Sequence, residues 1–154
     1  MDAVLYHSPV GRLLINGDEK GIQEIIFEEK FREPVPEHSN HMLVLASEWL
    51  DLYFSGRKPE FTVPVNLQVT PYTCKVLREI GKIPYGETVT YGELAEKLNS
   101  SARAVGGAAG RNPVPLIIPC HRVIGSRGKL TGYGGGKERK KKLLEIEGIR
   151  FRTE

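Results

Sequence analysis

The sequence has little cysteine and no long apolar run. Its 154 residues include two cysteines, Cys74 and Cys120. Two cysteines are too few for a disulfide framework, and a reducing cytosol keeps such thiols free, although a single bridge between them stays open. No apolar run approaches the roughly 18 residues that span a bilayer, and the first residues lack the regions of a secretory signal. We therefore expect a cytoplasmic protein.

Nucleotide-binding motifs and repeats are also absent. Glycines cluster in residues 132–136, but neither the GxxxxGK[ST] nor the GxGxxG spacing is met, so a phosphate-binding loop of those kinds is excluded. The apolar fraction of 40% and the charged fraction of 27% are those of an ordinary globular protein. A chain of this length can bury a core as one domain or as two small ones.

The first third of the chain predicts a small antiparallel sheet. Three short apolar segments, residues 4–6, 12–16 and 22–27, are separated by turn-forming stretches rich in glycine and proline. Strands joined by tight turns have this pattern, so we expect a three-stranded meander.

A helix is predicted after this sheet. Ser39 or Asn40 can cap it, it runs to Tyr53 or Phe54, and Gly56 is well placed to end it. Four apolar residues at helical spacing are expected to face the core: Leu43, Ala46, Leu50 and Tyr53.

The two halves of the chain differ in charge. Residues 1–70 carry 6 Lys and Arg against 11 Asp and Glu, whereas residues 71–154 carry 16 against 8. We place a domain boundary in the proline-broken connector between them, which gives domains 1–66 and 67–154. A basic domain indicates a polyanionic partner. Lysines in 137–142 could instead form a solvated helix face, but that leaves other cations unexplained: Arg103, Arg111, Arg122, Arg127 and Lys129.

The basic half predicts a helix that begins at Thr70 and Pro71 and ends near Gly81. Threonine is a good N-cap, and proline fits the first helical turn. Cys74 lies three residues before Leu77 on the expected inward face, so we expect Cys74 in the core. Val76 and Ile80 share that face.

Two short helices, residues 91–98 and 102–110, are expected next. Thr90 and Glu93 fit a capping box at the start of the first helix. Two short helices across a polar turn suggest a helix-turn-helix. The pair Gly106-Gly107 costs the second helix on the order of 1 kcal/mol per glycine, which suggests a surface that comes close to another backbone.

The stretch Pro119-Cys120-His121-Arg122 carries the clearest chemical signal. It follows the apolar run 116–118, which we expect to be buried and strand-like. Cationic neighbours lower the pKa of a thiol and favour the nucleophilic thiolate. The alternative is a structural cysteine beside a solvated His-Arg pair. A last helix is expected over residues 137–147, closed by Gly148.

Several motifs together resemble one protein family. They are Tyr91 with its capping box, Ala102 to Ala108, Asn112 to Pro115, Ile118 to Val123, Tyr133 to Gly136 and Glu147-Gly148. Over about residues 70–150 the chain resembles the O6-alkylguanine-DNA alkyltransferases closely, and before that loosely.

The resemblance implies an α+β fold. A small ribonuclease-H-like domain, an antiparallel sheet with a helix, would precede a mostly helical, winged-helix-like domain with a helix-turn-helix. It also implies a DNA repair activity, that of a methylated-DNA–protein-cysteine methyltransferase. Such a protein binds double-stranded DNA from the minor groove, flips out an O6-alkylguanine, and also O4-alkylthymine, and moves the alkyl group to Cys120 once. We expect a monomer that needs no cofactor.

The resemblance assigns roles at the reactive site. His121 would take the thiol proton through a water, and Glu147 would orient His121, the logic of nucleophile, base and orienter. Tyr91 would contact the base and donate a proton, as a phenol can. Asn112 would support the thiol. Without the resemblance, each of these four residues would be given an ordinary structural role.

Further residues are assigned to DNA and to the base pocket. Arg103 would fill the stack left by the flipped base, and Thr73 and Ser126 would contact DNA. The expected pocket residues are Val123, Tyr133 and Gly134. Some relatives carry serine at the Gly134 position, so a hydroxyl contact is lost here. Zinc sites in relatives use N-terminal cysteines, and none precedes Cys74, so we expect no metal.

Three other functions remain open from the sequence. A lesion-binding protein without chemistry would lack the cysteine, so Cys120 argues against it. A helix-turn-helix regulator would prefer an operator sequence over a lesion. A cysteine hydrolase would turn over repeatedly.

Overall fold

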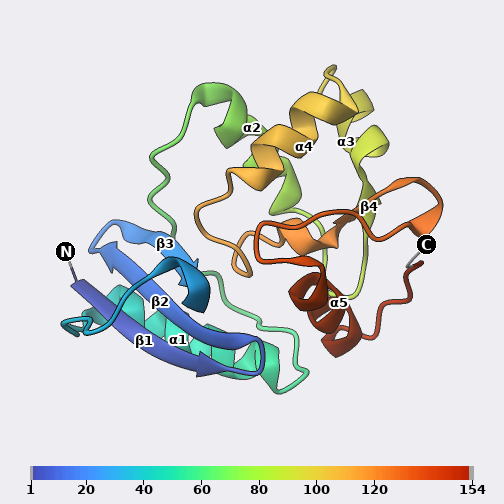
Figure 1. Cartoon of the computed structure of the whole chain (residues 1–154). Helices are drawn as coiled ribbons and strands as arrows, with labels where there is room; N and C mark the ends of the chain where they lie inside the picture. Colours follow the sequence, from blue (N-terminus) through green and yellow to red (C-terminus); the bar gives the residue numbers. More distant parts are fainter. Residues whose placement is uncertain (1, 153–154) are drawn as a thin grey trace. The chain divides into compact units, whose positions relative to one another are not determined.

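The computed structural model describes residues 2–152, which form two compact units, one ending at Gln68 and the other beginning at Val69 (Figure 1). The boundary expected after residue 66 lies close to this division. Within the described residues, each helix is too short or too polar to span a lipid bilayer.

The first unit is a three-stranded antiparallel sheet with one helix. Strands β1 (Asp2–Ser8), β2 (Gly11–Asp18) and β3 (Gly21–Phe27) pair in the order β1-β2-β3. The predicted meander is therefore confirmed. Helix α1 (His41–Phe54) contacts all three strands and lies along the sheet (Figure 1). A short 3₁₀ turn, η1 (Glu28–Lys30), leaves β3.

The core of this unit is formed by alternate apolar residues of the strands and by apolar residues at helical spacing on α1. Leu13 and Ile15 of β2 are fully buried, as expected where alternate residues share one face. The four α1 residues predicted to face inward are also fully buried. The Asn40 side chain accepts from the Leu43 amide at 3.0 Å, and Gly56, with φ of +82°, ends the helix. Only glycine adopts that conformation readily.

The second unit is mostly helical. Its helices are α2 (Pro71–Ile80), α3 (Tyr91–Lys97), α4 (Ala102–Gly110) and α5 (Lys137–Ile146). A parallel pair of two-residue strands, β4 (Val89–Thr90) and β5 (Val123–Ile124), links its parts. Two 3₁₀ turns flank β5, η2 (Cys120–Arg122) and η3 (Ser126–Gly128).

Helices α3 and α4 pack on each other and on their neighbours as a helix-turn-helix requires. The Thr90–Glu93 capping box is formed in both directions, and Ser101 caps α4 through the Ala104 amide. Helix α4 also contacts α2. The mixed α+β fold predicted from the sequence is confirmed by this architecture and by the structural neighbours described below.

Two local predictions are wrong. Residues 116–118 form an irregular turn, in which Leu116 is fully buried with φ of +77°. Cys74 is only partly buried, because the inward stripe of α2 runs through Thr73, Val76, Leu77 and Ile80. The buried residues of α2 begin at Thr73, whereas the spacing from Leu77 predicts that they include Cys74.

Helix α5 positions the functional residues described below, and its packing can be tested at Leu143. This side chain is fully buried, so Leu143→Ala should lower the free energy of unfolding by about 2–5 kcal/mol through lost burial and a cavity. The neighbouring exposed Lys142→Ala should change it by less than about 0.5 kcal/mol. Chemical denaturation of both variants measures this, and equal effects would contradict the proposed packing of α5.

Candidate active site

Asn112 organises the chain that leads to Cys120. Its side-chain amide donates to the Ile118 carbonyl at 2.9 Å and to the Cys120 Sγ at 3.2 Å. Its Oδ1 accepts from the Val114 amide at 3.0 Å. Both ends of the amide are thus used, which holds the turn over residues 112–118 and the thiol in one arrangement.

Cys120 begins the 3₁₀ turn η2 and is 7% exposed. His121 follows Cys120 within the same 3₁₀ turn. Burial raises the pKa of the Cys120 thiol, while Asn112, the Lys140 ammonium and Tyr133 act in the opposite direction. Because burial dominates, the resting group is a thiol, and its reaction requires a base.

His121 is fully buried and paired with Glu147. The His121 Nε2 lies 2.6 Å from Glu147 Oε2. Burial lowers the pKa of His121, against the opposing effect of Glu147. A neutral imidazole that donates Nε2–H to the carboxylate keeps Nδ1 as an acceptor, which is the state needed in a base.

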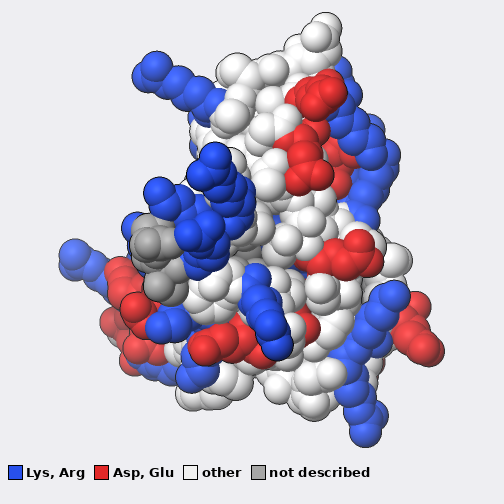
Figure 2. Space-filling view, turned by 90° about the vertical axis from the view of Figure 1, so that its right-hand side faces the viewer, with Lys and Arg blue, Asp and Glu red and all other residues white. Residues whose placement is uncertain are grey.

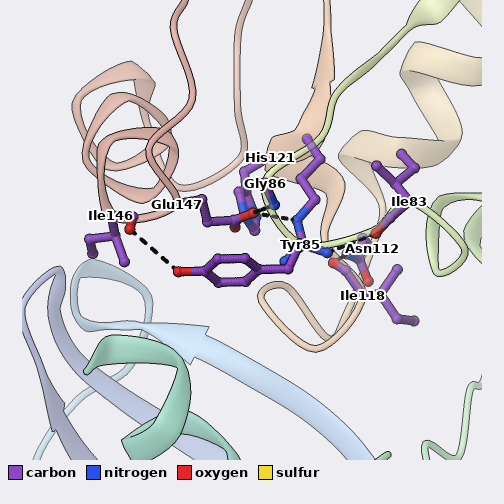
Figure 3. Close-up of polar contacts among 9 residues, drawn as sticks. Ile83, Tyr85, Gly86, Asn112, Ile118, His121, Ile146 and Glu147 are labelled. Carbon is purple, nitrogen blue, oxygen red and sulfur yellow. Dashed lines mark hydrogen bonds and ion pairs between the residues drawn. The ribbon is translucent and has the colours of Figure 1, made fainter. Parts of the chain in front are cut away.

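Glu147 receives hydrogen bonds from three directions. Its Oε1 accepts from the Gly86 amide at 2.9 Å and from Arg122 Nε at 2.8 Å, while Oε2 faces His121 (Figure 3). Burial alone would raise the pKa of Glu147, but the contacts with His121, Arg122 and Gly86 outweigh it and lower that pKa to about 2. The carboxylate is therefore ionised at neutral pH.

Arg122 is a structural partner of this carboxylate. It is 7% exposed, its Nη1 donates to the Ile83 carbonyl at 2.8 Å, and its guanidinium lies over the Tyr85 ring at 5.7 Å. The expectation that Arg122 contributes to a polyanion-binding surface is therefore wrong. A buried guanidinium needs such partners.

Lys140 is a buried cation of this cluster that was not predicted from the sequence. It is fully buried, and its Nζ donates to the Val123 carbonyl at 2.7 Å and to Thr131 Oγ1 at 3.2 Å. Nζ also lies 5.8 Å from the centre of the Tyr91 ring. Burial lowers the pKa of Lys140 to about 8, although the Cys120 thiolate would raise it.

The signal that could have revealed Lys140 lies in the helical spacing. Lys140, Leu143, Leu144 and Glu147 follow each other at intervals of three, one and three residues, which places them on one face of α5. The alternative that the lysines of 137–142 form a solvated helix face is wrong for Lys140, which is buried.

A pocket of about 180 Å³ opens beside Cys120. A Cβ added to Gly106 would come within 3.9 Å of the Tyr91 ring, and one added to Gly107 within 3.3 Å of Arg111 Nη1. The first is an ordinary contact and the second involves the end of a flexible side chain, so packing within the described residues does not by itself require these two glycines, and a close approach to another backbone stays a prediction. The pocket is lined by Tyr91, Gly106, Ala109, Gly110, Cys120, Gly132, Tyr133 and Gly134.

The predicted pocket residues are only partly placed as expected. Tyr133 and Gly134 line the pocket, whereas Val123 is fully buried and its carbonyl is bonded to Lys140. Burial raises the pKa of Tyr91, although a hydrogen bond with Thr131 acts against it. Burial also raises the pKa of Tyr133, as does the Cys120 charge. Both phenols therefore keep their protons.

The residues predicted to contact DNA lie outside this cluster. Arg103 is exposed in the first turn of α4, and Ser126 is exposed in η3. Thr73 is 1% exposed, and its hydroxyl lies 3.1 Å from Thr70 Oγ1 and 3.5 Å from Arg111 Nη2. The burial of Thr73 contradicts a direct contact with DNA. Within residues 2–152, no three His, Cys, Asp or Glu side chains are grouped to hold a metal ion.

Comparison with known proteins identifies the family. The DNA binding domain of 6-O-methylguanine DNA methyltransferase matches residues 71–149, and the ribonuclease-like domain of the same proteins matches residues 3–67. The chain belongs to the 6-O-methylguanine DNA methyltransferase family. The predicted resemblance is thus confirmed for both halves.

Relatives in this family match nearly the whole chain. The methylated-DNA–protein-cysteine methyltransferase of Methanosarcina acetivorans is 41% identical over 150 residues, which are 94% of this chain and 96% of that protein. That of Mycobacterium tuberculosis is 43% identical over 145 residues, 91% and 88% of the two chains. The crystal structure of M. tuberculosis OGT in complex with DNA matches with a TM-score of 0.85 and 40% identity, covering 96% of this chain and 92% of that one.

Gly134 has open space beside it on the wall of the pocket. A Cβ added to Gly134 meets nothing within 4 Å. A serine would therefore fit at this position without displacing a neighbour.

The ionised state of Glu147 predicts a pH dependence of stability. Its pKa of about 2 lies below the ordinary value of 4.5, so its stabilisation is full above about pH 4.5 and is lost as pH falls through 2. The difference corresponds to about 3 kcal/mol. Glu147→Gln should therefore lower the free energy of unfolding at pH 7 by at least that order, and by much less near pH 2.

The matched control is Glu145→Gln, an exposed carboxylate on the same helix. Denaturant unfolding of both variants across this pH range measures the effect. A Glu147→Gln curve that runs parallel to that of the parent protein at all pH values would show that Glu147 is not ionised as described.

Proposed function

We propose that this protein is a methylated-DNA–protein-cysteine methyltransferase that repairs O6-alkylguanine in double-stranded DNA by moving the alkyl group to its own Cys120. The observation that carries this proposal is the position of Cys120 on the wall of a pocket. The next residue, His121, is a buried neutral base that is held by the ionised carboxylate of Glu147. Family membership supports the same reaction.

The first step is removal of the thiol proton. His121, held with Nδ1 as its acceptor, takes the proton from Cys120 through a water, and Glu147 stabilises the imidazolium that forms. The Lys140 ammonium, which acts on the Cys120 pKa, favours the resulting thiolate. Burial of Cys120 thus keeps its thiol protonated in the free protein. Once an alkylated base occupies the pocket, the neighbouring charges favour ionisation of the thiol.

The second step is displacement at the alkyl carbon. The thiolate forms a carbon–sulfur bond as the bond from that carbon to the guanine O6 breaks, and the electron pair stays on the guanine. Tyr91, whose raised pKa keeps it protonated, donates a proton to the leaving base. The Lys140 ammonium, whose Nζ lies 5.8 Å from the centre of the Tyr91 ring, stabilises the resulting phenolate by opposite charge.

The reaction consumes the protein. A thioether on Cys120 has no good leaving group, and neither His121 nor Lys140 can displace the alkyl group from sulfur as readily as the thiolate gained it. Each molecule therefore acts once, and no cofactor takes part in the transfer.

DNA enters by the minor groove in this proposal. Arg103 is exposed at the start of α4 and can replace the flipped base in the stack, since unstacking costs a few kcal/mol that a substitute offsets. The pocket also suits O4-alkylthymine, a second oxygen-alkylated base. A monomeric state and a cytoplasmic location stay predictions.

Incubation with duplex DNA that contains one O6-methylguanine tests the proposal. Intact mass spectrometry should show one added CH₂ on the protein, mapped to Cys120 by peptide analysis, and never more than one methyl group per molecule. Cys120→Ser should accept none, whereas Cys74→Ser should accept as much as the parent protein. DNA binding should survive in both variants.

The other outcomes separate the alternatives. Lesion binding without a mass gain would identify a non-catalytic damage-recognition protein. Preference for an operator sequence with indifference to the lesion would favour a regulator. Multiple turnover on an acyl substrate would favour a hydrolase.

A further inference from the structure

Thr131 lies between two polar groups that come from different helices. Its Oγ1 accepts a hydrogen bond from the Lys140 Nζ of α5 at 3.2 Å. Its side chain also makes a hydrogen bond with Tyr91, the first residue of α3. An ammonium group can only donate, whereas a hydroxyl both accepts and donates. The contact with Lys140 therefore leaves the hydroxyl proton of Thr131 available for the Tyr91 oxygen.

The Thr131 hydroxyl is held in place by the packing of the methyl group on the same carbon. A Cβ added to Gly125 would lie 2.7 Å from Thr131 Cγ2, so a side chain at position 125 would displace this methyl group. The Gly125 amide donates to the Lys129 carbonyl at 2.8 Å, which closes the turn before Thr131. Threonine is stiff about its first side-chain bond. Fixing the methyl group therefore also fixes the direction of the hydroxyl.

The hydroxyl supplies a path that Lys140 and Tyr91 do not form through the ring contact. The Val123 carbonyl holds Lys140 Nζ at 2.7 Å, and Nζ lies 5.8 Å from the centre of the Tyr91 ring. That contact acts through charge on the face of the ring. Thr131 connects the polar end of Lys140 to the phenol oxygen by hydrogen bonds, along which a proton can move.

Lys140 is suited to supply a proton at this point. Figure 2 shows Lys and Arg side chains that extend from one face of the molecule into solvent, whereas Lys140 is fully buried. Burial lowers the pKa of Lys140 to about 8, and burial raises the pKa of Tyr91 above its ordinary value of 10. The Cys120 charge raises both pKa values, so it preserves this order. Transfer of a proton from the Lys140 ammonium to a Tyr91 phenolate is therefore favourable.

We propose that Thr131 is a positioning residue that relays a proton from Lys140 to Tyr91 during alkyl transfer. As Tyr91 gives its proton to the leaving guanine, its oxygen takes the hydroxyl proton of Thr131, and Thr131 Oγ1 takes a proton from Lys140 Nζ. Only O–H and N–H bonds are exchanged. The guanine gains one proton, Tyr91 and Thr131 end as they began, and Lys140 ends as a neutral amine that water protonates again. The inference rests on the repair function proposed above.

The test uses variants of the full chain that keep or remove the hydroxyl. Thr131→Val keeps the branched shape and removes the hydroxyl. Thr131→Ser and Thr131→Ala both remove the methyl group and differ from each other only in the hydroxyl. Thr88→Val is the matched control, because it makes the same exchange at another half-buried threonine of this unit. For each variant, single-turnover kinetics give the rate constant of methyl transfer from duplex O6-methylguanine, and fluorescence anisotropy gives the affinity for that duplex.

Thr131→Val and Thr131→Ala should each lower the rate constant of transfer about tenfold, which is part of the roughly 10²–10⁴ that general acid–base catalysis contributes. Their affinity for the duplex should equal that of the parent protein. Thr131→Ser and the Thr88→Val control should stay within about twofold of the parent rate. Equal rate constants for the Ser and Ala variants would overturn the proposal, whether or not the Val variant folds.

A double-mutant cycle with Tyr91→Phe tests whether Thr131 acts through Tyr91. Because Tyr91→Phe removes the oxygen to which the proton is relayed, adding Thr131→Val should lower the rate constant by less than about a further twofold. A further loss as large as that in the parent background would contradict the relay. Failure of the parent protein to accept any methyl group would instead refute the repair function, so the two failures are distinguishable.

Discussion

The buried charge of Glu147 is the constraint on which the second unit depends. A carboxylate without partners in this position would be strongly unfavourable. Glu147 lies at the end of α5. Its partners are the Gly86 amide, in a turn, and the side chains of His121 and Arg122, which follow Cys120. Segments far apart in the sequence are therefore held together around one carboxylate, and the reactive cysteine is held with them.

This arrangement explains how a buried thiol can stay protonated and still serve the proposed alkyl transfer. Burial keeps Cys120 protonated, Asn112 fixes its sulfur, and the Glu147 charge holds His121 in the state of a base. Lys140 adds a positive charge below Tyr91. A buried ammonium is unfavourable unless it is hydrogen-bonded, and the Lys140 ammonium is held by the Val123 carbonyl and the Thr131 hydroxyl.

Much of this was predictable because it depends on local sequence. The Thr90–Glu93 capping box forms as the spacing requires, and the Cys-His motif led to the correct family. Lys140 was missed because the burial of a charge depends on partners that only the fold supplies, here the Val123 carbonyl. The left-handed backbone of Leu116 is likewise not predicted by its residue type. The resemblance predicts a DNA contact for Thr73, but the packing of the fold buries its side chain.

The most direct test of this account is the protonation state of His121. Nitrogen NMR of histidine-labelled protein, with the His121 signals assigned by a His121→Asn variant, reports which ring nitrogen carries the proton. A neutral ring with its proton on Nε2 throughout the neutral pH range is the predicted result. A doubly protonated ring, or a proton on Nδ1, would contradict the role given to Glu147.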